Sequence, residues 1–357
     1  LVTVVQLVDV RLRNLDDVTQ LTGGPHRMSH LLRHRRGLHR GLRILADRER
    51  TVVLHQHRLR LRILLQGFDH AFADGFGADE AERADRHRAA ELVAAYEKVK
   101  DSQVKDLIED YKAKYDVAPE LLDSRYDELF IAAKEEAAMV NMMSENGCTA
   151  GVDNFEDLGT LPQLPGVGPQ RFPSEYGWGF SAEGDWKTSV LVRIGAVMGY
   201  GLEGGASLME DYSYNFVPGN EFDMGSHMLE VSPSIGTIAK PKLAIYPLGI
   251  GGKSDPVRLV FSGKPADAVV VSMADERERF RLLMDEVTIV EPQGSLKNLP
   301  CARAVWKPKP DLKTAVQCWI TAGGSHHTCM TTSVGREAWE DFARIAGVEL
   351  AVIAENT

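Results

Sequence analysis

The feature that most constrains the fold is a change of residue pattern near Gly205. Before it, apolar residues recur at helical spacing, which predicts a helix whose buried face carries Val104, Leu107, Ile108, Tyr111 and Tyr115. We expect further helices over 126–143 and 188–199. Between these two helices, residues 159–180 are rich in Gly and Pro and predict a long loop.

After Gly205 the pattern becomes that of short β-strands separated by Gly, Pro, Asn and Asp, which is typical of an antiparallel sheet or barrel. The expected strands are Met228–Val231, Leu243–Tyr246, Val257–Phe261, Ala268–Ser272 and Val287–Val290. A helix near 336–345 and a strand near 349–354 are expected to close the chain.

Residues 1–90 differ in composition from the rest. They contain 16 Arg and 8 His but no Lys, Tyr or Trp, and their net charge is +5 against −15 for the remainder. A basic arm for nucleic acid is one interpretation. We favour a non-natural reading frame of GC-rich DNA, because the stretch has no clean helical or strand period. We therefore assign residues 1–90 no function and expect them to pack poorly.

Length and composition bound the class of protein. The 357 residues suffice for two ordinary domains or one large one, and 44% apolar with 26% charged residues is ordinary for soluble protein. No run of 18 apolar residues predicts a membrane span, and no signal peptide pattern is present. The net charge of −10 argues against nucleic acid or an anionic membrane as partner. The four cysteines form no C-x-x-C pair, which favours a reduced, cytoplasmic setting. Because the chain begins with Leu1, we expect a fragment or an unconventional start.

Candidate chemistry concentrates in a few turns. The three histidines after residue 90 lie in the small-residue turns Gly225-Ser226-His227 and Gly323-Gly324-Ser325-His326-His327. Acidic residues lie in Glu183-Gly184-Asp185 and Glu210-Asp211. Carboxylates with imidazoles and no thiolate suit a divalent ion such as Mn²⁺. Taken singly, each residue is better explained as a solvated or hydrogen-bonded side chain, and Asp185 and Asp211 as helix caps.

Several of these segments together resemble the signature segments of the bacterial L-arabinose isomerase family. They are Asn154-Phe155-Glu156-Asp157-Leu158, Glu183-Gly184-Asp185-Trp186-Lys187, Met209-Glu210-Asp211-Tyr212, Gly225-Ser226-His227-Met228-Leu229-Glu230, Leu248-Gly249-Ile250-Gly251-Gly252-Lys253 and Gly323-Gly324-Ser325-His326-His327-Thr328. Their order and spacing agree with the family from about residue 91 to 357. Several separated motifs in register are far more specific than one short pattern.

The resemblance implies a set of site residues. The family's Mn²⁺ ligands fall on Glu183, Glu210, His227 and His327, where the second histidine of the His326-His327 pair is the ligand. Family positions that line the sugar pocket fall on Phe155 and Ile250.

The resemblance also implies a fold, an α/β protein with a Rossmann-like α/β domain followed by an antiparallel β-barrel domain, as in L-fucose isomerase. Residues 1–90 have no family counterpart. Residues 91–205 correspond to most of the central Rossmann-like domain and 206–357 to the barrel domain. The family's first domain has no counterpart here, and homo-hexamers, which the family forms, are doubtful for this chain.

The family reaction converts the small sugar L-arabinose to L-ribulose in arabinose catabolism, with D-galactose to D-tagatose as a side activity. The resemblance makes Glu183 and Glu210 the candidates for proton transfer through an ene-diol. A metal-assisted hydride shift is the competing mechanism. The alternative function is a truncated, catalytically impaired remnant that only binds metal or sugar.

Overall fold

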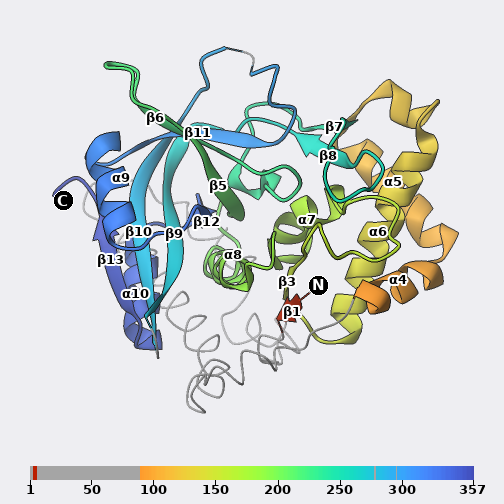
Figure 1. Ribbon diagram of the computed structural model, residues 1–357, viewed down its shortest axis with the longest axis horizontal. Helices are drawn as coiled ribbons and strands as arrows, with labels where there is room; N and C mark the ends of the chain where they lie inside the picture. Colours follow the sequence, from red (N-terminus) through yellow and green to blue (C-terminus); the bar gives the residue numbers. More distant parts are fainter. Residues whose placement is uncertain (1–2, 6–88, 277–278, 295) are drawn as a thin grey trace, which may run out of the picture. The chain divides into compact units, whose positions relative to one another are not determined.

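The structure is a computed structural model, and it describes residues 3–5, 89–276, 279–294 and 296–357 (Figure 1). All of these belong to one compact unit. The expectation that residues 1–90 pack poorly falls outside the described residues, apart from strand β1 (Thr3–Val5) and the start of the first described helix. No helix of the described part is both long and apolar enough to cross a bilayer.

Three helices pack together at the start of the described chain. Helices α4 (Ala89–Lys98) and α5 (Asp101–Lys114) lie against α6 (Tyr126–Glu145), and strand β2 (Asp116–Val117) and the 3-10 helix η2 (Pro119–Leu122) connect α5 to α6. The predicted helical face is confirmed for Val104, Ile108 and Tyr111, which α5 buries, while Leu107 is half-buried. Tyr115 is also buried, one residue beyond the end of the helix.

A pair of parallel strands leads to the candidate site. Strand β3 (Ala150–Val152) pairs with β4 (Gly179–Ser181) in parallel and with β1 in antiparallel. The predicted long loop over 159–180 was wrong in part, since it contains helix α7 (Val167–Arg171), the π-helical turn η3 (Phe172–Tyr176) and most of β4. Arg171 at the end of α7 is buried and bonds Glu136 of α6 at 3.0 Å and Asp110 of α5 at 2.7 Å.

Helix α8 (Trp186–Met198) follows β4 after the turn of residues 182–185 and confirms the helix expected over 188–199. It contacts β4 on one side and β12 and β5 on another. Two glycines allow this close packing. A Cβ at Gly179 would lie 2.0 Å from the backbone oxygen of Ser189, and one at Gly195 would lie 2.7 Å from Thr331 Cγ2. Helix α8 therefore holds the end of β4 close to the strands of the second half of the chain.

Most strands of the second half form one seven-stranded sheet. Its members are β5 (Ala206–Asn215), β6 (Phe222–Ser226), β9 (Ala266–Glu276), β10 (Arg279–Val290), β11 (Arg303–Pro308), β12 (His327–Thr331) and β13 (Glu349–Ile353). The order is β11-β6-β5-β12-β9-β10-β13, and β10 also pairs with β11. The strand pairings that begin at β11 therefore return to β11 through β10.

Most expected strands are confirmed, and one is wrong. The runs at 268–272 and 287–290 lie within β9 and β10, and those at 243–246 and 257–261 match β7 (Lys242–Ile245) and β8 (Val257–Val260). Met228–Val231 forms no strand. It is a buried irregular turn that follows β6. The apolar run there reflects burial, which a short turn shares with a strand.

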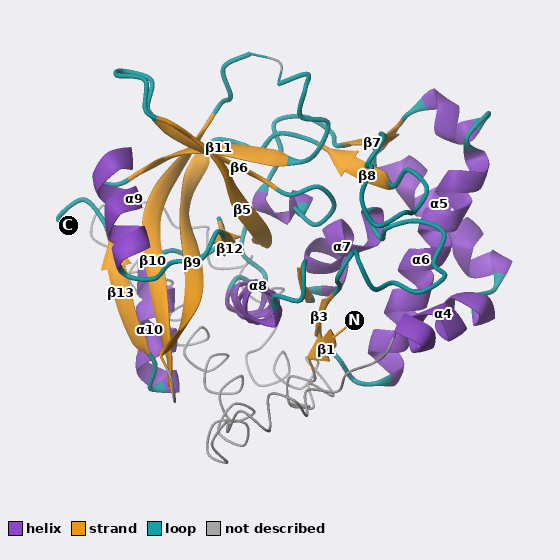
Figure 2. Cartoon of the chain, in the orientation of Figure 1, coloured by secondary structure: helices purple, strands orange, loops and turns teal. Residues whose placement is uncertain are grey.

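The remaining elements complete the fold. Strands β2, β7 and β8 form a three-stranded sheet, and the 3-10 helix η4 (Pro233–Ile235) precedes β7. Helices α9 (Leu312–Thr321) and α10 (Arg336–Ala346) pack on β10 and β13 (Figure 2). The expected closing helix and strand are thereby confirmed as α10 and β13. The chain is thus a mixed α/β protein with parallel and antiparallel strands.

Candidate metal centre

Strand pairing brings three of the four expected ligands together. In the register of β5 and β12, Glu210 is the direct partner of His327. Glu210 is also the partner of Ser226, the last residue of β6, so His227 comes directly after that neighbouring strand. Because neighbouring strands lie roughly 5 Å apart, residues 210, 227 and 327 lie close together across three neighbouring strands.

The fourth expected ligand, Glu183, lies in the tight turn between β4 and α8. Its backbone is left-handed, with φ of 57°, which is uncommon for a residue with a side chain. Hydrogen bonds from Gly184 N to Asp153 O and from Asp185 N to Ala182 O, both 2.9 Å, hold this turn. Strain of this kind persists where the surroundings impose it, and it gathers at functional sites.

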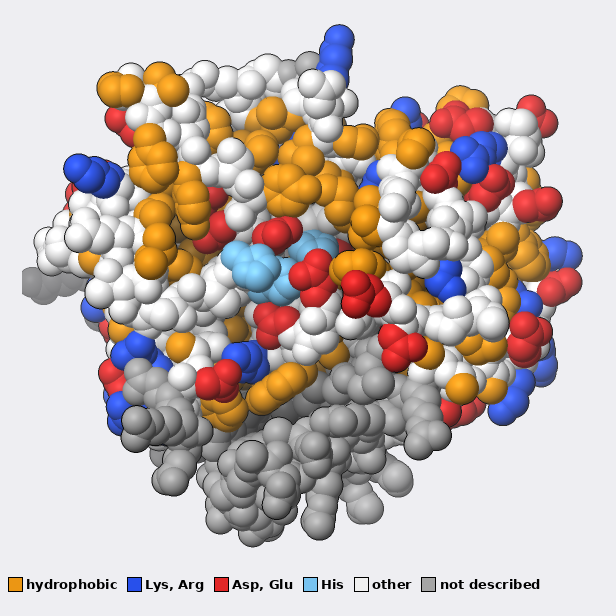
Figure 3. All heavy atoms as spheres, viewed as in Figure 1, with side chains coloured by type: hydrophobic (Ala, Val, Ile, Leu, Met, Phe, Trp, Pro, Cys, Tyr) orange, Lys and Arg blue, Asp and Glu red, His pale blue; other side chains and the backbone are white. Residues whose placement is uncertain are grey.

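The four side chains form two carboxylate–imidazole pairs. Glu183 Oε2 lies 3.8 Å from His327 Nε2, and Glu210 Oε2 lies 3.9 Å from His227 Nε2. The rings of His227 and His327 are 5.3 Å apart between centroids. In Figure 3 histidine side chains gather with acidic side chains at the middle of the viewed face. The structure thus brings all four expected ligands into one region.

Two further carboxylates orient the imidazoles through their other nitrogen atoms. His227 Nδ1 hydrogen-bonds to Glu230 Oε2, which also accepts a bond from Leu229 N. His327 Nδ1 lies 3.4 Å from Asp185 Oδ2. In metal sites a ligating histidine usually donates its second N–H to such a group, which fixes the ring and its tautomer. Both Nε2 atoms are therefore directed toward the carboxylates of Glu183 and Glu210.

The electrostatics of the site favour a cation. Burial lowers the pKa of His227, but the nearby carboxylates of Glu230, Glu210 and Glu183 outweigh it and raise that pKa to about 9. Burial acts to raise the pKa of Asp185, yet hydrogen bonds from His327 and Thr188 hold it below its usual range. An excess of buried or half-buried negative charge is the environment that a divalent ion neutralises.

The residues present fit such an ion. His327 is 4% exposed, and its Nε2 has no hydrogen-bond partner among the described residues. An unsatisfied buried nitrogen costs free energy, which coordination to a cation would recover. Two carboxylates and two imidazoles form a donor set that Mn²⁺ accepts.

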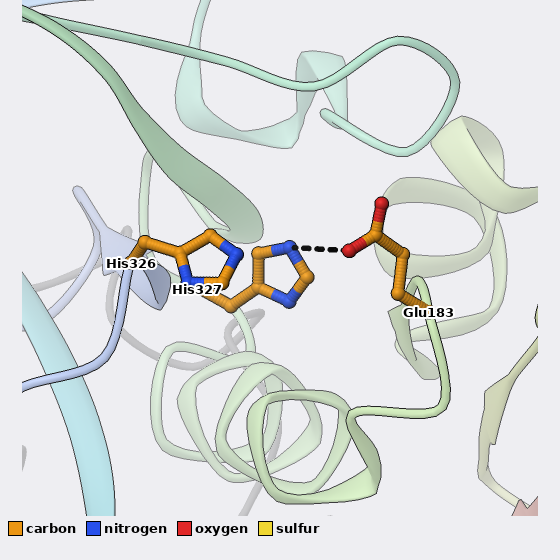
Figure 4. A group of neighbouring side chains, drawn as sticks. All are labelled: Glu183, His326 and His327. Atoms are coloured by element: carbon orange, nitrogen blue, oxygen red, sulfur yellow. Dashed lines mark ion pairs between the residues drawn. The ribbon is translucent and has the colours of Figure 1, made fainter.

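His326 lies beside the expected ligands as well. Its ring centroid is 4.3 Å from that of His327, and ligand atoms of Glu183, His326 and His327 all lie within 4.8 Å of one another. Figure 4 shows the three side chains, with the ion pair between His327 and Glu183 dashed. The choice of His327 over His326 as the Mn²⁺ ligand stays a prediction, supported by the buried Nε2 of His327.

The two expected sugar-pocket residues lie on neighbouring loops. A Cβ at Gly251, beside Ile250, would be 2.9 Å from the backbone oxygen of Phe155. Ile250 is 40% exposed, and Phe155 is half-buried. The loops therefore touch, and the role of both side chains in binding sugar stays a prediction.

Sequence reasoning missed the orienting roles of Glu230 and Asp185. Asp185 is the N-cap of α8, as considered, and also contacts His327. Asp211 lies within β5, so its interpretation as a helix cap was wrong. The spacing of three residues from His227 to Glu230 was an available signal, but only the turn of 228–230 brings the carboxylate back to the ring.

Comparison with known proteins identifies the family to which two parts of the chain belong. The family model described as L-arabinose isomerase central domain matches residues 81–201, and the one described as L-arabinose isomerase C-terminal domain matches 205–349. An L-arabinose isomerase of Bifidobacterium adolescentis is 99% identical over 267 residues, which cover 75% of this chain and 53% of that protein.

More distant relatives match over the same span. L-arabinose isomerases of Bifidobacterium longum and Clavibacter sepedonicus are 88% and 52% identical over 268 and 269 residues, again 75% of this chain and 53% of each relative. The chain thus spans about half the length of the relatives it matches. Residues 81–201 and 205–349 of this chain belong to the L-arabinose isomerase family, as its central and C-terminal domains.

Proposed function

We propose that this chain carries the Mn²⁺-binding and proton-transfer residues of an aldose–ketose isomerase that converts L-arabinose to L-ribulose in arabinose catabolism. The observation that carries the proposal is the convergence of Glu183, Glu210, His227 and His327, with a buried His327 nitrogen that has no hydrogen-bond partner among the described residues. D-galactose, converted to D-tagatose, is the proposed second substrate. The relatives named L-arabinose isomerase support the substrate class.

The proposed chemistry moves a hydrogen between C1 and C2 of the open-chain sugar. A divalent cation, when bound, supplies positive charge that polarises and orients the two sugar oxygens. Glu183 and Glu210 stand on different elements and face the same space, so one can remove a proton while the other returns one. The strand pair β5–β12 and the turn before α8 hold the two carboxylates in fixed places. A hydride shift between the same two carbons is the alternative mechanism.

The residues around the ligands have supporting roles in this proposal. Glu230 and Asp185 hold the imidazole rings, and Phe155 and Ile250 cover the apolar face of the sugar. Positioning of this kind contributes much of an enzyme's rate enhancement, because it removes the entropic cost of aligning reactants.

The finer fold and the setting are also proposals. We assign the α/β part to a Rossmann-like domain, which the parallel pair β3–β4 supports, and the returning sheet pairings to the family's β-barrel. A cytoplasmic location is supported by four free cysteines.

A second candidate is a catalytically impaired remnant that binds metal or sugar. It is favoured by one fact, that the chain matches only about half of each relative. Residues from the unmatched part of those proteins would then be needed to close the site and exclude water.

Two proteins distinguish the candidates: the chain as printed, and a fusion in which the unmatched N-terminal part of a full-length relative, its first domain included, replaces residues 1–80. L-ribulose formation from L-arabinose is measured with Mn²⁺ for both. We expect slow turnover from the chain and a clear gain from the fusion, abolished by Glu210→Gln. If a well-folded fusion shows no turnover, the second candidate, binding of metal or sugar without catalysis, is favoured.

A further inference from the structure

The His326 side chain plays no part in the proposed isomerisation, although it lies in the same cluster as two of the ligands. We propose that Glu183, His326 and His327 form an alternative metal-binding set, selective for ions that prefer imidazole nitrogen, such as Zn²⁺. Occupation of this set excludes Mn²⁺ from the four-ligand set. The proposal rests on the proposed function, because both sets share Glu183 and His327.

Geometry sets these three residues apart. They are the group of three or more His, Cys, Asp or Glu in the described part of the chain whose ligand atoms all lie within 4.8 Å of one another. Glu210 and His227 stand outside that group. The group therefore combines Glu183 and His327 of the four-ligand set with His326, which lies outside that set (Figure 4).

The two imidazoles are held side by side by their backbone. The carbonyl oxygen of His326 accepts a hydrogen bond from Asp211 N at 3.0 Å, and Ser325 Oγ donates to the carbonyl oxygen of His327. The His327 Nε2 atom is buried without a hydrogen-bond partner among described residues and lies 3.8 Å from Glu183 Oε2. Glu183 and His326 are exposed, so an ion can reach all three from solvent.

The donor set suits a tetrahedral ion with one position left for water. Zinc bonds of about 2.0–2.2 Å place neighbouring ligand atoms roughly 3.3–3.5 Å apart. The 3.8 Å between His327 and Glu183 then has to shorten by only a few tenths of an ångström, which side-chain rotation supplies. Zinc also binds a given nitrogen and oxygen site more tightly than manganese does.

The consequence is competition within one site. A zinc ion on Glu183, His326 and His327 takes two of the four ligands expected for Mn²⁺ and leaves Glu210 and His227 unused. Zinc therefore displaces Mn²⁺ from the site, and the His326 imidazole determines how tightly the zinc ion binds. Removal of the His326 imidazole raises the preference of the site for Mn²⁺ over Zn²⁺.

The test measures two ions on two variants of the full chain. Affinities for Zn²⁺ and for Mn²⁺ are determined separately by calorimetry for the unchanged chain, His326→Ala and His227→Ala. We expect His326→Ala to weaken Zn²⁺ binding by at least about tenfold while Mn²⁺ binding changes by less than about twofold, because a direct ligand is lost only for zinc. His227→Ala, the matched control, is expected to do the reverse.

A displacement experiment checks exclusivity. Zinc added to the Mn²⁺-loaded chain should release manganese one for one, seen as the rise of the free Mn²⁺ electron spin resonance signal. His326→Ala should require more zinc for the same release. If His326→Ala does not fold, as judged by circular dichroism, His326→Gln replaces it.

The outcomes separate this inference from the proposed function. Unchanged Zn²⁺ affinity in the folded His326 variant overturns the alternative set, as does equal loss of zinc in both variants. Loss of Zn²⁺ in His326→Ala with unchanged Mn²⁺ binding in His227→Ala supports the alternative set and contradicts the four-ligand set.

Discussion

The carboxylates behind the two imidazoles determine how well each ring presents its Nε2 atom. Glu230 bonds His227, and Asp185 contacts His327 while capping α8 through Thr188 N at 3.1 Å. A ring without its partner can rotate and change tautomer, so the nitrogen proposed to bind the ion would no longer be fixed. In the proposed site, loss of either carboxylate would therefore lower metal affinity, although neither is a proposed ligand.

Glu230→Gln tests this role at a single residue. Loss of the charged acceptor is expected to weaken Mn²⁺ binding by about 10–100-fold, since partners of ligating histidines have effects of this size. Calorimetric titration of Mn²⁺ at one fixed pH measures it. Glu221→Gln, at an exposed position near β6, serves as the control and should bind as the unchanged chain does. Equal affinity in both variants would contradict the role of Glu230.

At the scale of elements, the close packing of α8 against β4 determines the position of Glu183 in the turn between them. Gly179→Ala forces a Cβ to within 2.0 Å of Ser189 O, a backbone atom that has to move with its helix. We expect the free energy of unfolding to fall by about 1–3 kcal/mol, as for other overpacked sites. Chemical denaturation measures it.

Gly335→Ala is the control for that substitution. Nothing lies within 4 Å of its added Cβ, and its φ of −104° suits any residue. The expected change is at most about 1 kcal/mol, because Ala is a poorer helix N-cap than Gly but meets no steric conflict at this position. Equal destabilisation by Gly179→Ala and Gly335→Ala would show that α8 is not closely packed against β4 at Gly179.

The strand β10 carries a buried carboxyl that makes stability depend on pH. Burial, with Asp211 and Glu286 nearby, raises the pKa of Asp285 to about 8 despite Lys309. The unfolded chain loses this proton near pH 4, and the folded chain keeps it to about 8. The unfolded state therefore binds fewer protons in this window, so the contribution of Asp285 to stability falls as pH rises from 4 to 8.

Asp285→Asn removes this dependence while keeping the shape of the side chain. The variant's free energy of unfolding, relative to that of the unchanged chain, is expected to rise by roughly 1–3 kcal/mol from pH 5 to pH 8. This is the scale for a polar group buried without a partner. Denaturant unfolding at both pH values measures the gain. Asp267→Asn, at an exposed position on β9, should show none. If the difference in free energy of unfolding between Asp285→Asn and the unchanged chain is the same at pH 5 and pH 8, the assigned ionisation is contradicted.

Sequence patterns predicted the elements that have a simple periodicity. The buried face of α5, the helices α6 and α8 and the strands β7 to β10 were predicted from apolar spacing, which reports burial on one side of an element. The turn at Met228–Val231 was mistaken for a strand, because a short run of apolar residues has the same pattern in a buried turn as in a buried strand. The short elements between 167 and 181 were missed, since Gly and Pro also occur inside π-helical and α-helical turns.

The candidate site was predictable through motifs rather than through periodicity. Glu183, Glu210, His227 and His327 lie far apart in the chain, and only strand pairing and the β4–α8 turn bring them together. The position of His326 beside Glu183 was not predictable, because the direction of a side chain just before a strand depends on the local backbone.

At the scale of the whole molecule, the chain matches 53% of its Bifidobacterium adolescentis relative. The family resemblance implies homo-hexamers, and we expect much of the subunit contact to be made by the unmatched part of such relatives. We therefore expect the chain as printed to form no stable hexamer, and the fusion with a relative's first domain to assemble further. Light scattering coupled to size exclusion gives both masses. A hexamer from the chain alone would show that the retained domains suffice for assembly.

The most direct test of the account is the metal content of three proteins loaded with Mn²⁺ and dialysed: the chain, Glu210→Gln, and Glu203→Gln at a carboxylate that is 95% exposed. Elemental analysis should find about one Mn²⁺ per chain in the first and third and far less in the second, because a direct ligand is lost only there. Equal manganese content in all three would contradict a site built from Glu183, Glu210, His227 and His327.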